Sequence, residues 1–262
     1  MKIRIFYILI GLLMALNISA QNISKPVIKK RSMDTPKCST TIKKKITVRI
    51  ARDKPYHSKN NSYKQISANE LLESARNYYK NKDYKNAFDI YNKPLVQQIM
   101  LGDDYCHLAD MYSLGEGCTT DKNQAFRYYS QAMQLGSAFG EFCIGRFYEC
   151  GDGGVQKDFK KAISFYKNAA EKGDWNAIVS LIYIYKNGSN EISKNFEELA
   201  KWLKKAIDAI GLPRHMFELG NMYETGLGVS KNYEQAVLLY KKAAQEGNKD
   251  AQKRLQELKE TW

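Results

Sequence analysis

The sequence predicts an all-α fold, a solenoid of stacked antiparallel helix hairpins, and three observations support this prediction. The 262 residues are 44% hydrophobic, which is enough to bury a core. From about residue 68 onward, the same amphipathic pattern with helical periodicity recurs in tandem. A single hairpin of this kind cannot bury its apolar faces alone, so neighbouring hairpins have to stack on one another.

Each unit of the repeat has an apolar stretch that ends in Tyr, a loop that opens with Gly, and a second amphipathic stretch with small residues. The Tyr positions are 36, 37 and 38 residues apart, and a Gly follows each Tyr by three positions. An Ala in the second stretch recurs at a constant step of 37. The period is therefore near 37 residues. The markers are Tyr112, Tyr148, Tyr185 and Tyr223; Gly115, Gly151, Gly188 and Gly226; and Ala132, Ala169, Ala206 and Ala243.

Glycine inside the first stretch also carries structural information. Gly145 and Gly220 each cost ~1 kcal/mol of helix propensity relative to Ala, so we expect them to permit close approach of the partner helix. The Gly that follows each Tyr is typical of a left-handed helix C-cap. The stretch from Ala251 to Lys259 predicts a capping helix that shields the end of the stack.

Two units carry a family resemblance most clearly. Unit three runs from Ile144-Gly145 through Tyr148 to Gly151, and unit five has Leu219-Gly220, Tyr223, Gly226-Leu227-Gly228-Val229 and then Ala243-Ala244 with Gly247. These phrases resemble the Sel1-like repeat, the longer-looped relative of the tetratricopeptide repeat. Unit four departs from the pattern at Phe196, Leu199 and Leu203, and the first unit, joined through Lys82-Asp83-Tyr84, is more similar to a plain tetratricopeptide repeat.

The resemblance implies a right-handed α-solenoid of five repeats followed by the capping helix, with a mostly irregular N-terminal extension. The expected units, numbered one to five in chain order, are about 68–103, 104–137, 138–175, 176–212 and 213–250, within a repeat domain of 67–250, and the cap occupies 251–262.

The N-terminus has the three parts of a secretory signal peptide in residues 1–20. Lys2 and Arg4 precede an apolar stretch at 5–16, and Ile18-Ser19-Ala20 closes the segment. The alternative is a single anchor helix, but the apolar stretch is short for a bilayer span. We therefore expect an exported protein, periplasmic or extracellular.

Positive charge is concentrated in the predicted extension, residues 21–66. Residues 21–65 hold 13 Lys or Arg against two Asp, whereas residues 66–262 hold 26 residues of each sign. The extension is either a solvated linker or a segment attracted to an anionic envelope surface, and nucleic acid is not an expected partner. Residues 46–50 alternate with a period of two and would suit a short strand.

Five cysteines in an exported chain favour disulfide bonds. Cys143 and Cys150 are about 10 Å apart along one helix and cannot bond each other. We favour Cys106 with Cys143 and Cys118 with Cys150, which leaves Cys38 unpaired. A zinc site is the alternative, but there is no CxxC motif and the three His are dispersed, so no metal is expected.

Catalysis has little support in the sequence. There is no HExxH or GxSxG motif, and the Gly-rich segments 151–154 and 226–228 follow helices rather than strands, unlike phosphate loops. Ser113 and Ser180 are the candidate nucleophiles, and neither has a base at a readable spacing. We therefore expect no enzymatic activity and no cofactor.

Binding is the favoured function, because the resemblance implies that the first helices line a concave groove. The groove mixes aromatic residues with both charges, which suits a protein or an extended peptide better than a polyanion. The expected role is an exported non-catalytic scaffold; the alternative is a cell-wall or β-lactam-related binding protein or hydrolase. For Phe142 and Phe217, packing in the core between repeats is an equal alternative. The predicted groove residues are Phe139, Phe142, Arg146, Glu149, Tyr183, Lys186, Arg214, Phe217, Asn221 and Glu224.

Overall fold

The computed structural model describes residues 67–189 and 191–262, and every regular element in this part of the chain is a helix. The predicted all-α fold is confirmed. Residues 1–66, with the predicted signal peptide, extension, strand and Cys38, lie outside the described residues. No described helix is long and apolar enough to cross a membrane. The helices are α2 (Ala68–Lys80), α3 (Tyr84–Tyr91), α4 (Pro94–Gln97), α5 (Gly102–Leu114), α6 (Lys122–Gln134), α7 (Ala138–Cys150), α8 (Phe159–Glu171), α9 (Trp175–Asn187), α10 (Phe196–Ala209), α11 (Pro213–Thr225), α12 (Tyr233–Gln245) and α13 (Lys249–Glu257).

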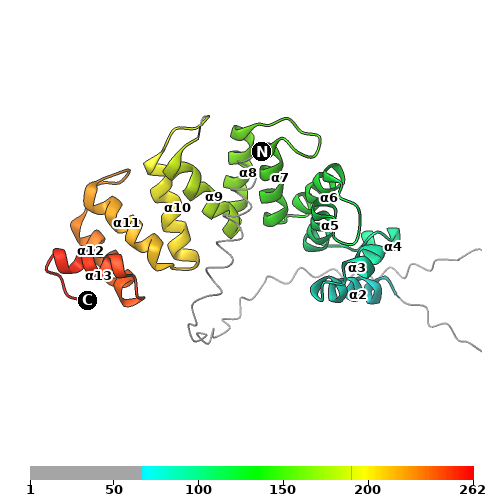
Figure 1. The fold of residues 1–262 in the computed structure, drawn as a ribbon, viewed down its shortest axis with the longest axis horizontal. Helices are drawn as coiled ribbons and strands as arrows, with labels where there is room; N and C mark the ends of the chain where they lie inside the picture. Colours follow the sequence, from blue (N-terminus) through cyan, green and yellow to red (C-terminus); the bar gives the residue numbers. More distant parts are fainter. Residues whose placement is uncertain (1–66, 190) are drawn as a thin grey trace, which may run out of the picture. The chain divides into compact units, whose positions relative to one another are not determined.

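The helices pair into hairpins in chain order, as Figure 1 shows. Units two to five are the hairpins α5–α6, α7–α8, α9–α10 and α11–α12. The second helix of each unit also packs against the first helix of the next. The first helices of units two to five thus form one row and the second helices another.

The second helices begin at an N-cap that recurs at the repeat step of 37. Its side chain accepts a hydrogen bond from a backbone N–H of the first turn, and its own N–H donates to the carbonyl of the Tyr two residues before the end of the preceding first helix. This pair of bonds fixes where each loop leaves one helix and enters the next. The N-caps are Asp121, Asp158, Asn195 and Asn232.

Three of the four Gly residues that follow the repeat Tyr form the left-handed C-cap that the sequence predicts, namely Gly115, Gly151 and Gly226. At Gly188 the prediction is wrong, because its φ of 70° is combined with an extended ψ of −176°. A Cβ atom at Gly145 would lie 2.7 Å from the Tyr166 ring. Inside α7, therefore, Gly is required for the ring of the partner helix to sit against the backbone.

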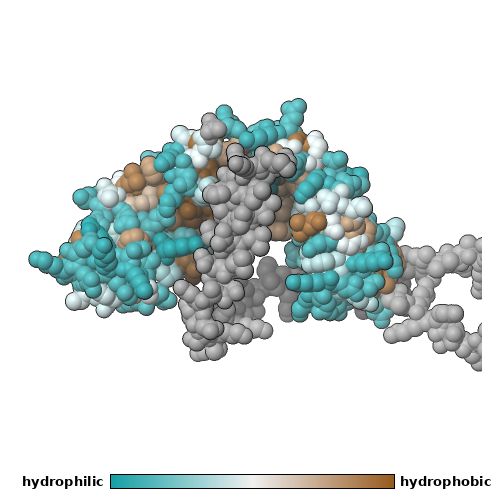
Figure 2. All heavy atoms as spheres, in the orientation of Figure 1, coloured by the Kyte–Doolittle hydropathy of each residue, from teal (hydrophilic) through white to brown (hydrophobic). Residues whose placement is uncertain are grey.

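The core is continuous through the middle of the stack. One cluster of buried side chains extends from α5 to α12, and smaller clusters close the ends at units one and five. Trp202 of α10 is the largest fully buried side chain in the described part of the chain. Figure 2 shows apolar residues only in scattered patches on the visible face.

The two ends differ in detail from the prediction. A tight turn at residues 81–83 joins α2 to α3, as expected for the first unit, but α4 is an additional short helix that begins at Pro94. The capping helix runs two residues earlier than predicted, from Lys249 to Glu257, because Asn248 caps it.

Candidate functional site

The predicted groove residues lie on α7, α9 and α11, but only part of the set is open to solvent. Phe142 is buried, and Phe139, Glu149, Phe217, Asn221 and Glu224 are half-buried. The exposed members of the set are Arg146, Tyr183, Lys186 and Arg214.

The phenylalanines of the set pack within the stack. Phe142 is only 8% exposed, and its ring centroid is 5.4 Å from that of Tyr166 in α8. Phe217 lies 5.5 Å from Tyr240 of α12 in the same way. Phe142 therefore belongs to the core, and its prediction as a ligand-facing residue is wrong, because the close helix approach at Gly145 brings the Tyr166 ring toward α7.

Three polar members of the set are engaged by a tyrosine of the same unit. Tyr166 donates its hydroxyl to Glu149 Oε2 at 2.5 Å. The Tyr240 hydroxyl lies 2.7 Å from both Asn221 Oδ1 and Glu224 Oε2, and its single proton is shared between these two acceptors. We call this hydrogen bond from a second-helix Tyr to a first-helix polar side chain the tyrosine lock.

Unit two has the same lock, formed by Tyr129 and Asp110. Tyr79 of α2 donates a second hydrogen bond to Asp110 at 3.3 Å. Burial raises the pKa of Asp110 above its usual value, and the bonds from the two tyrosines act in the opposite direction. The lock positions Tyr129, Tyr166 and Tyr240 fall on the 37-residue grid, with Leu203 in unit four.

The lock of unit five extends to the capping helix. Arg254 of α13 forms an ion pair with Glu224, with its Nε 3.1 Å from Oε2. The hydrogen bond from Arg254 lowers the pKa of Glu224. Glu224 is thus tied to both α12 and α13, which explains why it is half-buried.

Unit four has no lock, because Leu203 has no hydroxyl to donate. Its first helix carries Tyr183, which is 51% exposed, and Lys186, whose Nζ lies 2.8 Å from Glu218 Oε1 of unit five. Glu218 was not among the predicted residues. The structure therefore brings an exposed aromatic ring, an ammonium group and a carboxylate to the first-helix face at units four and five.

A buried histidine that is not among the predicted groove residues lies at the same boundary. His215 of α11 is 5% exposed, and its ring centroid is 5.9 Å from that of Trp175 in α9. Its Nε2 accepts a hydrogen bond from Arg214 Nε at 3.3 Å, and its Nδ1 has no partner among the described residues. Burial and the neighbouring Arg214 lower the pKa of His215 to about 4.

The four described cysteines are free thiols in the structure. The Sγ of Cys106 lies 3.4 Å from Ser137 Oγ, and Cys118 donates to the carbonyl of Met111 at 3.4 Å. Burial raises the pKa of Cys106 to about 12, so this thiol is protonated and a poor nucleophile at neutral pH. Neither predicted pair, Cys106 with Cys143 or Cys118 with Cys150, is bonded.

Ser164 and Lys167 on α8 have the SxxK spacing of some serine hydrolases. Lys167 Nζ lies 2.9 Å from Glu198 Oε1. Burial acts to lower the pKa of Lys167, but hydrogen bonds with Glu198 and Tyr185 outweigh it and raise the pKa. The amine is therefore held as an ammonium ion, the wrong protonation state for a general base.

Comparison with known proteins gives a consistent result. The Sel1 repeat family model matches residues 98–137, 142–174, 177–209 and 216–248, which is more than half of the chain. A Sel1 repeat protein from Oxalobacter formigenes is 28% identical, with a TM-score of 0.55 over 69% of this chain and 72% of that one. A protective antigen of uropathogenic Escherichia coli with an SLR fold is also 28% identical, with a TM-score of 0.59 over 72% of this chain and 40% of that one.

Curated relatives are similar over a shorter region. The chitin synthase regulator SKT5 of Saccharomyces cerevisiae is 36% identical over 131 residues, which is 50% of this chain and 18% of that protein. Chitin synthase regulatory factor 3 of Schizosaccharomyces pombe is 33% identical over 142 residues, 54% of this chain and 15% of that protein. The chain thus matches less than a fifth of the length of either regulator.

Proposed function

Because the chain belongs to the Sel1 repeat family, we propose that it is a non-catalytic adaptor that binds a segment of another protein on its first-helix face. The observation that carries the proposal is the open surface of unit four, where Tyr183 is 51% exposed and Lys186 lies beside it on α9. Aromatic residues are enriched among the residues that dominate binding energy. The relatives named as regulators of chitin synthase support a role in which the repeats act on another protein.

The locks limit where the partner binds. Glu149, Asn221 and Glu224 already accept hydrogen bonds within the stack, so a ligand would have to compete with a bond in place. No described residue forms a hydrogen bond with the Tyr183 hydroxyl, and Lys186 pairs with the carboxylate of Glu218 in unit five rather than with its own second helix. The partner is therefore proposed to bind mainly at unit four, with Arg146 and Arg214 as flanking exposed cations.

We also propose that the chain acts outside the cytoplasm, after cleavage behind Ala20, and that its basic extension holds it near an anionic envelope surface. N-terminal sequencing of the protein recovered from its host tests the cleavage and is expected to begin at Gln21. Deletion of residues 21–65 is expected to abolish binding to anionic vesicles and to leave the helical circular dichroism unchanged.

The adaptor role is tested by affinity capture from the native envelope with the double variant Tyr183→Ala with Lys186→Gln. The matched control is Tyr233→Ala with Lys231→Gln, which removes an exposed Tyr and an exposed Lys near the start of α12. We expect the first variant to weaken capture of the partner by about tenfold or more, as removal of a central aromatic anchor does. Equal capture by both variants, with the helical signal retained, would contradict the proposal.

A further inference from the structure

The second helices carry a row of three lysines that recur at the repeat step of 37, and two of these lysines form an ion pair with a carboxylate. Lys167 Nζ lies 2.9 Å from Glu198 Oε1, and Lys241 Nζ lies 3.0 Å from Glu260 Oε2. The middle member, Lys204, has no ion pair with any described residue. The row therefore has one open position, in unit four.

The repeat register explains why Lys204 is left without a carboxylate. Glu198, the partner of Lys167, stands three residues after the N-cap Asn195 of the next second helix. The equivalent position in α12, three residues after Asn232, is occupied by Gln235. A neutral amide thus stands at the position that, one unit earlier, supplies the negative charge to Lys167.

The remaining surroundings of the two lysines are alike. Lys167 Nζ lies 5.5 Å from the ring centroid of Tyr185, and Lys204 Nζ lies 5.4 Å from that of Tyr223. Both rings belong to the first helix of the next unit. Lys204 therefore makes the same contact with a tyrosine ring as Lys167 does, and it differs from Lys167 in having no carboxylate partner.

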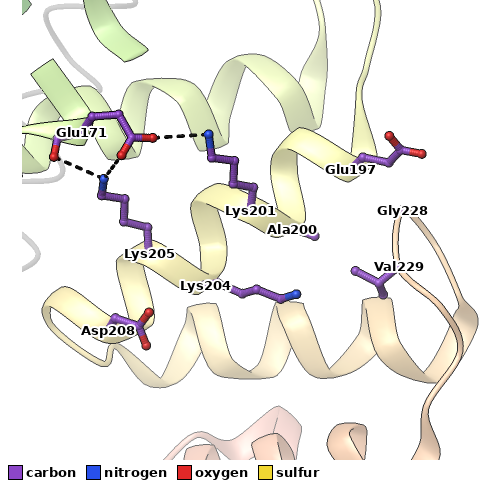
Figure 3. A pocket seen from close by; sticks show the side chains of 9 residues that line it. All are labelled: Glu171, Glu197, Ala200, Lys201, Lys204, Lys205, Asp208, Gly228 and Val229. Carbon is purple, nitrogen blue, oxygen red and sulfur yellow. Dashed lines mark hydrogen bonds and ion pairs between the residues drawn. The ribbon is translucent and has the colours of Figure 1, made fainter. Parts of the chain in front are cut away.

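Lys204 lines an open cavity of about 550 Å³ between α10 and the loop that joins α11 to α12. Figure 3 shows Lys201 and Lys205 turned toward Glu171, with which they pair at 3.3 and 2.5 Å, whereas Lys204 points to the opposite side, toward Val229. Lys201 and Lys205 therefore share one glutamate, and Lys204 is the lysine of the cavity that has no carboxylate partner among the described residues.

Two further carboxylates shape the charge of the cavity. Glu197 and Asp208 line it, both are exposed, and neither forms an ion pair with a described residue. The lining thus holds three ammonium groups and three carboxylates, a balance that does not attract a polyanion but allows Lys204 to pair with a single carboxylate whose neighbours are neutral or basic.

We propose that this cavity is a docking site for one acidic side chain, Glu or Asp, on an extended segment of a partner protein. The carboxylate occupies at Lys204 the place that Glu198 occupies at Lys167, and the stem of the side chain packs against Val229. The site lies between α10 and the α11–α12 loop and does not include Tyr183 or Lys186. It therefore adds a second contact surface to the one proposed above.

Lysine side-chain NMR on the full chain tests this directly, with the peptides Ac-Ala-Glu-Ala-NH₂ and Ac-Ala-Gln-Ala-NH₂ as probes. The Lys204 ε-methylene signal, assigned by its loss in Lys204→Gln, is expected to shift saturably with the glutamate peptide. No saturable shift is expected with the glutamine peptide. Absence of a saturable shift with the first, or an equal shift with both, would overturn the proposal.

The variant Gln235→Glu restores the internal carboxylate and is expected to shift the Lys204 signal without peptide and to weaken glutamate-peptide binding by about fivefold. Gln124→Glu is the matched control, because it adds the same charge at the equivalent position of α6, which belongs to unit two, whereas Lys204 belongs to unit four. If Gln235→Glu leaves both the signal and the affinity unchanged, or if Gln124→Glu acts equally, the assignment is wrong.

Discussion

Unit four differs from units two, three and five in the hydrogen bonding between the polar side chains of its first helix and its second helix. In those three units a second-helix tyrosine bonds to the first helix, as in the 2.5 Å bond from Tyr166 to Glu149. In unit four Leu203 replaces the tyrosine, and Tyr183 and Lys186 have no bond to α10. The difference shows that a polar residue at a groove position is not by itself a contact site, because most such residues already stabilise the stack.

The largest expected effect is the loss of a lock tyrosine. Tyr166 is 1% exposed, so Tyr166→Ala should lower the free energy of unfolding by about 3 to 5 kcal/mol through the cavity it leaves. Tyr233→Ala, at a second-helix tyrosine that is 45% exposed, should change it by about 0.5 kcal/mol or less. Urea denaturation followed by circular dichroism measures both, and equal losses would show that the lock tyrosines are not structural.

His215, at the boundary between units four and five, should make the folding stability of the stack decrease at acidic pH. The pKa of His215 is about 4 in the folded chain and 6.5 for a free side chain, so the unfolded chain binds the proton first as the pH falls. The stabilising contribution is complete above pH 6.5 and is lost progressively toward pH 4, by about 3 kcal/mol in total. Arg214 and Lys186 oppose protonation of His215, and Glu218 favours it.

Stability measured between pH 4 and 7 for the wild type and His215→Gln checks this sign. The difference between the two proteins isolates His215 from the carboxylates that titrate in the same range. We expect the wild type to lose its advantage over the variant as the pH falls. A difference that does not depend on pH would mean that the ring is not held neutral in the folded chain.

Removal of a single tyrosine hydroxyl should have a smaller effect on stability, and the effect should differ between a unit with the lock and unit four. Tyr166→Phe removes the bond to Glu149 and should lower the free energy of unfolding by about 1.5 to 3 kcal/mol, as expected for a hydrogen bond to a charged group. Tyr183→Phe removes the hydroxyl of an exposed tyrosine and should change stability by about 0.5 kcal/mol or less. If both variants lower the free energy of unfolding by the same amount, the hydrogen bond of the tyrosine lock does not stabilise the stack.

The architecture could be predicted from the sequence because each of its determinants is local. The Gly C-caps, the Ala of the second helices and the Gly at 145 and 220 recur at fixed spacing, and helix packing follows from them. The short helix α4 was not predicted, because a single Pro94 in an irregular segment has no periodic counterpart.

The site could be predicted only in part, because its decisive feature is a pairing between helices. Tyr183 and Lys186, which the analogy predicted in the groove, are exposed, but the analogy could not show that Glu149 and Glu224 bond to tyrosines or that Phe142 is buried. The one available signal was the substitution of Leu203 on the 37-residue grid. The same grid, read at Lys204 and Gln235, would have indicated the open lysine.

Site-specific photo-crosslinking in the native host tests most directly the claim that unit four is the open part of the first-helix face. The photoreactive residue p-benzoylphenylalanine replaces Tyr183 in one variant and Asn221, its locked equivalent in unit five, in another. We expect a crosslinked partner from position 183 and little or none from position 221. Equal crosslinking at the two positions, or crosslinking at 221 alone, would contradict the account.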